Sequence, residues 1–146
     1  METMQTLTET GTVLRERSAE FRDAVQQRLY QDVLESRQVF PISLRHTHLE
    51  LADACAWVLE RTPATGAVPA EVLDRLRELG RDHRRHGFPA DIYPAFAGAL
   101  SHGLHSLDIP RADAATRALD TVCSVMAAAA READLAGIAP AFSAEV

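Results

Sequence analysis

The chain has 146 residues, of which 47% are hydrophobic and 25% charged, and its formal net charge is -6. This length and balance predict one folded domain and exclude a disordered chain, and the negative charge excludes a broad basic face for nucleic acid. No run reaches the roughly 20 apolar residues of a membrane span. The polar first residues lack the apolar segment of a signal peptide, so we expect a cytoplasmic protein.

Apolar residues recur at helical spacing, and no stretch alternates long enough to predict a strand. The predicted helices cover about residues 18–36, 44–61, 69–86, 89–107 and 112–136, and a short helix around Leu14 is a further candidate. Proline and glycine corners separate these uneven helices, which favours an orthogonal all-α arrangement over a regular bundle. We expect one domain over residues 1–146, with about 1–12 and 138–146 poorly ordered.

One histidine stands on an apolar helix face. In the helix predicted over residues 69–86, His83 shares a stripe with Val72, Leu76 and Leu79. A histidine in this position is either a core residue with a hydrogen-bond partner or a ligand to a metal. His86 lies one turn further along, next to the expected helix end, and we expect it to be exposed.

The segment from Leu79 to Tyr93 resembles the proximal region of bacterial flavohaemoglobins and related single-domain globins. In that family a glycine stands three residues before the haem-ligand histidine, and a tyrosine stands ten residues after it. Gly80, His83 and Tyr93 have this spacing. The resemblance covers nearly the whole chain and implies a globin-like orthogonal helical fold with His83 on the iron. The chain has no CxxCH attachment motif, so the expected cofactor is haem b.

Three further fragments match the family in order and spacing. Arg28-Leu29-Tyr30 looks like the distal-tyrosine segment, which implies that the Tyr30 hydroxyl donates a hydrogen bond to the bound ligand. Phe40-Pro41 looks like the corner whose phenylalanine stacks on the porphyrin. Near the end of the last helix, Asp134 matches an acidic partner of the proximal histidine, acting together with Tyr93. Glu132 is the alternative acidic residue.

The distal side departs from the family pattern. Counted from Phe40, the position that usually holds glutamine falls on Thr47, and the apolar residue one turn later is Leu51. The segment between Tyr30 and Phe40 is also shorter than the family's. A register shift of one residue would bring His46 or His48 to the iron instead. Of these two, His48 shares the apolar stripe of its helix.

The resemblance implies a haem protein that binds a diatomic gas, O2 or NO, in oxygen binding or transport. An alternative is an NO dioxygenase or weak peroxidase that takes electrons from a separate flavin reductase, because the chain ends at Val146 without room for reductase domains. A third hypothesis is a haem-free globin-like module for sensing or protein contacts, which Thr47 and the short segment before Phe40 favour. The sequence leaves a homodimer open.

Overall fold

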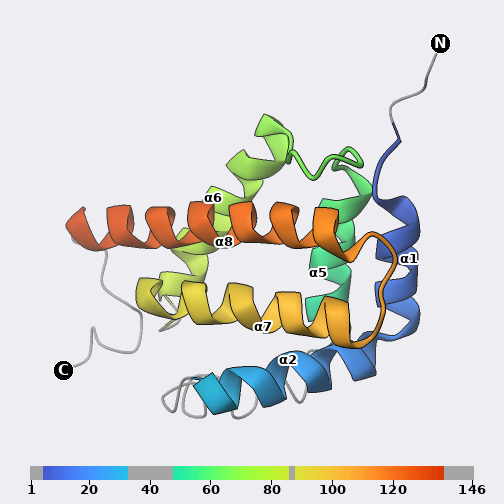
Figure 1. Cartoon of the computed structure of the whole chain (residues 1–146). Helices are drawn as coiled ribbons and strands as arrows, with labels where there is room; N and C mark the ends of the chain where they lie inside the picture. The colour runs from blue at the N-terminus through green and yellow to red at the C-terminus, as the bar shows by residue number, and fades with distance from the viewer. Residues whose placement is uncertain (1–4, 33–47, 86–87, 137–146) are drawn as a thin grey trace.

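A computed structural model describes residues 5–32, 48–85 and 88–136 of the chain. The helices are α1 (Thr8–Glu16), α2 (Ser18–Asp32), α5 (His48–Glu60), α6 (Ala70–Arg85), α7 (Tyr93–Ser106) and α8 (Ala112–Leu135), with the short 3-10 helix η1 (Ala90–Ile92) before α7 (Figure 1). Over these ranges there is no strand, and the one isolated bridge joins Thr6 to Pro63. The predicted all-α fold class is confirmed.

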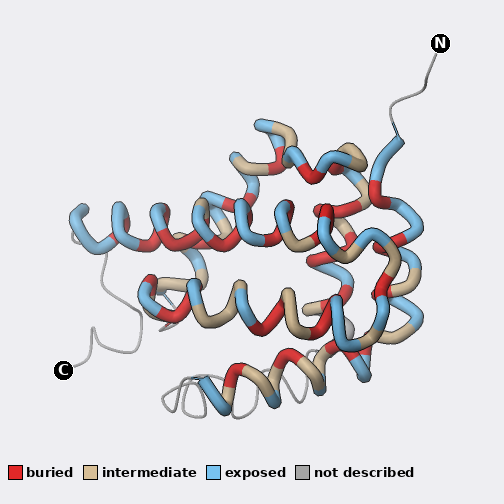
Figure 2. The backbone as a smooth tube through the Cα atoms, viewed as in Figure 1, coloured by how far each residue is buried: buried red, intermediate tan, exposed pale blue. Residues whose placement is uncertain are grey.

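The helices pack in crossed layers. α7 and α8 lie side by side, α2 lies against the outer side of α7, and α1 lies against α5 (Figure 1). α5 and α6 cross behind the α7–α8 pair, and α6 packs against α8 where the two helices cross. The buried residues face the spaces between these helices (Figure 2). Among the described residues, no helix combines the length and the apolar character needed to cross a membrane.

The apolar stripes read from the sequence form the core. Phe21, Val25 and Leu29 of α2 are fully buried, as their spacing of four residues predicts. The stripe predicted for the last helix, Leu119, Val122, Met126, Ala129 and Ala133, is buried as well. Helical periodicity therefore identified the buried faces of α2 and α8 correctly.

The start of the chain differs from the expectation of a poorly ordered segment over about residues 1–12. α1 begins at Thr8, and Leu7 and Thr10 are 1% and 0% exposed. The Thr10 hydroxyl donates a hydrogen bond of 2.8 Å to the carbonyl oxygen of Pro110, so its burial leaves no polar atom unsatisfied. The expectation is wrong from Leu7 onward, because a polar stretch carries just enough apolar side chains to pack on the core. Residues 138–146 lie outside the described part.

Gly80 brings α6 and α8 close together. A Cβ atom at Gly80 would lie 2.8 Å from the carbonyl oxygen and 2.9 Å from the Cα of Met126. Such distances are shorter than van der Waals contact, so any side chain here would force the two helices apart. The glycine therefore allows the second half of α6 to pack closely against α8.

Candidate functional site

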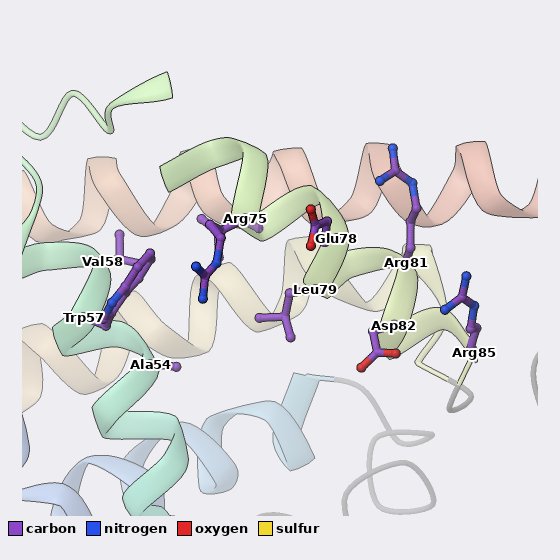
Figure 3. Close-up of a pocket in the computed structure, with 10 residues that line it drawn as sticks. Ala54, Trp57, Val58, Arg75, Glu78, Leu79, Arg81, Asp82 and Arg85 are labelled. Atoms are coloured by element: carbon purple, nitrogen blue, oxygen red, sulfur yellow. The ribbon is translucent and has the colours of Figure 1, made fainter. Parts of the chain in front are cut away.

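A crevice of about 700 Å³ lies between α5 and α6, within the roughly 300–1,000 Å³ typical of small-molecule sites (Figure 3). We call it the α5–α6 crevice. Its walls are Ala54, Trp57 and Val58 from α5 and Arg75, Leu76, Glu78, Leu79, Arg81, Asp82 and Arg85 from α6. The inner wall is apolar and the α6 rim is charged, so the crevice suits a ligand that has both an apolar body and polar groups.

The apolar wall continues the core. Val58 and Leu76 are buried, at 2% and 6% exposure, while Leu79 is half-buried and points into the space between the two helices (Figure 3). Trp57 is half-buried on α5 beside them. Sequence reasoning passed over Trp57 because it lies off the stripe of Ala52, Cys55 and Val58. A large aromatic residue next to a buried stripe is itself a signal for a second apolar surface.

The charged rim contains arginines in different settings. The Arg81 guanidinium lies 3.6 Å from the Glu132 carboxylate of α8, and its side chain turns away from the crevice (Figure 3). The Arg75 side chain instead extends toward Trp57, and its guanidinium carbon lies 5.6 Å from the ring centroid. Arg61 approaches the same ring at 4.4 Å. Sequence reasoning did not single out any of these cation–π contacts.

His83 lies in the last turn of α6 and is half-buried. It stands four residues after Leu79 and seven after Leu76, so it shares the helix face that these two crevice residues occupy. Its ring meets the Phe88 ring edge-on, with 5.7 Å between centroids and an interplanar angle of 80°. In the described ranges, no three His, Cys, Asp or Glu side chains gather as a metal cluster.

Phe88 joins His83 to an aromatic cluster. Its backbone N–H donates a hydrogen bond of 3.0 Å to the carbonyl oxygen of His83, and its side chain is buried. The Phe88 ring also contacts Tyr93 and Phe96, at centroid distances of 5.0 and 6.0 Å. Sequence reasoning missed Phe88, although an aromatic residue five positions after a candidate ligand, just past a glycine, was visible. The cluster restricts how the His83 ring can turn.

Tyr93 carries an unsatisfied polar atom. It begins α7, is 2% exposed, and its hydroxyl has no hydrogen-bond partner among the described residues. Burial raises the pKa of this phenol above its usual value, so the hydroxyl is protonated at neutral pH. Buried polar groups in proteins are nearly always hydrogen-bonded. The Tyr93 hydroxyl therefore calls for a partner other than the described residues.

The two acidic residues near the end of α8 pair with arginines of α6. Asp134 accepts a hydrogen bond of 2.8 Å from Nε of Arg84, and Glu132 faces Arg81. Both pairs tie α8 to the last turns of α6, where His83 lies. The role of Asp134 as a partner of the proximal histidine stays a prediction, since its partner in the structure is an arginine.

The structure describes the side chains of two of the residues predicted on the distal side, and the side chains of the others lie outside the described part of the chain. Tyr30 on α2 and Leu51 on α5 are both half-buried and pack against the core. The remaining positions lie outside the described residues: Phe40, His46, Thr47, His86 and the side chain of His48, which begins α5.

No model of a known protein family matches the chain, and no characterised protein or solved structure matches it either.

Proposed function

We propose that the protein binds haem b in the α5–α6 crevice, with His83 as the iron ligand, and that it binds a diatomic gas, O2 or NO. The observation that carries the proposal is the place of His83. It is a half-buried histidine on the same face of α6 as Leu76 and Leu79, which line the crevice. A neutral imidazole nitrogen on such a face is the donor that haem iron takes in globins.

The residues of the crevice fit a haem in three respects. Val58, Leu76 and Leu79 would provide an apolar wall for a flat macrocycle, and the arginines of the charged rim would be available to pair with its carboxylates. The volume of about 700 Å³ lies in the range of small-molecule sites. Among the described residues the buried Tyr93 hydroxyl has no hydrogen-bond partner, and it lies near the aromatic cluster of His83, which is expected when a bound group is part of the folded protein.

Each residue then has a defined task. His83 would hold the iron through one ring nitrogen, and its edge-on contact with Phe88 limits rotation of the ring. Haem supplies an iron atom with a free coordination position at which a diatomic gas binds. The resemblance implies Tyr30 as the donor of a hydrogen bond to the bound gas, and Phe40, Thr47 and Leu51 as further residues that would contact the haem.

Gas binding ranks ahead of the NO dioxygenase or peroxidase alternative. That chemistry needs an anionic acceptor that makes the proximal imidazole more electron-donating. Asp134 is the candidate acceptor, and its carboxylate pairs with Arg84 at 2.8 Å, which reduces its power to polarise a second group. A separate flavin reductase is therefore a partner only of the alternative function.

Titration of the purified protein with hemin tests the proposal. We expect one haem per chain and an intense Soret band with a five-coordinate or water-bound iron. His83→Ala should abolish this spectrum or lower hemin affinity at least tenfold, because the coordinate bond to the iron is lost. The matched control is His102→Ala, since His102 is also half-buried but lies on α7 beside Arg28 and should leave the spectrum unchanged.

Two outcomes would overturn the proposal. If His83→Ala takes up haem with an unchanged spectrum, the iron ligand is another residue. If the wild-type protein stays colourless with excess hemin while circular dichroism shows it to be folded, the haem-free module for sensing or protein contacts is the better function.

A further inference from the structure

The Arg75 side chain is placed for an anion. Arg75 extends from α6 into the α5–α6 crevice beside Trp57, as Figure 3 shows. Within the described ranges no carboxylate lies at ion-pair distance from its guanidinium, and its contact is the Trp57 ring, 5.6 Å from the guanidinium carbon. An arginine presents a planar fork of N–H donors that matches a carboxylate. Among the described residues, that fork has no carboxylate partner.

Among the charged residues that line the crevice, Arg75 is the best placed to bind a carboxylate of a ligand. Arg81 is directed to Glu132 on α8, and Arg85 stands ten residues from Arg75 along the helix, at the far end of the crevice. Two acids, Glu78 and Asp82, also line the crevice from the middle of α6. A bound carboxylate would be repelled there, so it is drawn toward the end where Arg75 and Trp57 lie.

We propose that Arg75, held against Trp57, is a specificity-determining residue that recognises a carboxylate of a flat, apolar ligand in this crevice. This inference rests on the proposed function only in taking the crevice as the ligand site, and it does not require an iron bond. Trp57 provides a flat apolar surface beside the guanidinium, while Val58 and Leu79 contact the body of the ligand. The crevice therefore distinguishes a dicarboxylic porphyrin from its neutral ester.

The test compares metal-free protoporphyrin IX with its dimethyl ester. Trp57 is the only tryptophan of the chain, so quenching of its fluorescence reports occupancy of the crevice directly. The wild-type protein should bind the diacid about threefold to fivefold more tightly than the ester, the range expected for a solvent-accessible ion pair. Arg75→Gln should remove this preference by weakening the diacid alone, whereas Arg75→Lys should keep part of it.

Arg77→Gln is the matched control. Arg77 lies on the same helix and pairs with Asp74, and it does not line the crevice, so the preference should persist in this variant. The inference is overturned if Arg75→Gln keeps the wild-type preference, or if neither porphyrin quenches Trp57. Because both probes lack iron, His83→Ala should not change these affinities. A failure of iron ligation in the hemin titration is thereby separated from a failure of carboxylate recognition.

Discussion

The two sides of α6 are packed in opposite ways. Toward α8 the backbones approach so closely that only glycine fits at position 80, with the carbonyl oxygen of Met126 2.8 Å from where a Cβ would stand. Toward α5 the same helix leaves a crevice of about 700 Å³, walled by Leu79 and Trp57. The close side anchors the helix, and the open side places Arg75 in the wall of a space that a ligand can fill, while His83 lies one turn beyond Leu79 on the same helix face. Because its packing against α8 holds α6 in place, the side of α6 that lines the crevice keeps its position when no ligand is bound.

Shortening one leucine of the packed core and one of the crevice wall should give the largest contrast. Leu104 on α7 is fully buried, so Leu104→Ala should lower the free energy of unfolding by about 2–5 kcal/mol through lost burial and the cavity left behind. Leu79 is half-buried in the crevice wall, and Leu79→Ala should cost about 1 kcal/mol or less in the ligand-free protein. Chemical denaturation followed by circular dichroism measures both. Equal losses would show that the crevice is closed in solution.

Glycine substitutions sharpen the comparison. Gly80→Ala should destabilise the protein by about 1–3 kcal/mol, because the added methyl group meets the Met126 backbone. It should also lower porphyrin affinity by displacing the end of α6. Gly98→Ala is the matched control, since a Cβ there meets nothing within 4 Å and alanine favours the helix by up to about 1 kcal/mol. A stable Gly80→Ala protein would contradict the close contact of α6 and α8.

The two cysteines should give the smallest effect. Cys55 on α5 and Cys123 on α8 are buried free thiols, and burial raises the pKa of each to about 12. The folded state therefore keeps both protons at a pH where the unfolded chain releases them. Stability is fully present below the ordinary thiol pKa and should fall by about 1 kcal/mol between pH 8 and 9. Replacing both cysteines with alanine should flatten this profile.

A thiol reagent compares the two sides of α5 directly. Ala54 lines the crevice and is exposed, whereas its neighbour Cys55 is 6% exposed. At pH 8 the wild-type thiols should not react until the protein unfolds, and Ala54→Cys should add one fast-reacting thiol. Fast reaction of wild-type Cys55 would place it on the crevice side.

The sequence alone determined the helices and most of the buried faces, because helical spacing of apolar residues is a local property. The stripes of α2 and α8 and the all-α class could be read from it, and so could the position of His83 on the helix face of Leu76 and Leu79. The role of His83 as an iron ligand stays a prediction. The polar residues around Thr10 led to a wrong expectation of disorder. The Thr10 hydroxyl is buried because it donates a hydrogen bond to the carbonyl oxygen of Pro110, one hundred positions away in the sequence.

The tertiary structure alone decided what surrounds those residues. How the helices cross determines the α5–α6 crevice, the edge-on contact of His83 with Phe88 and the approach of Arg75 to Trp57. It also leaves the buried Tyr93 hydroxyl without a partner among the described residues. Periodicity tells which face of a helix is apolar, but not which neighbour covers it or leaves it open. That choice follows from contacts distant in sequence, such as Gly80 on Met126, where the fit of two helix surfaces is set by packing rather than by local pattern.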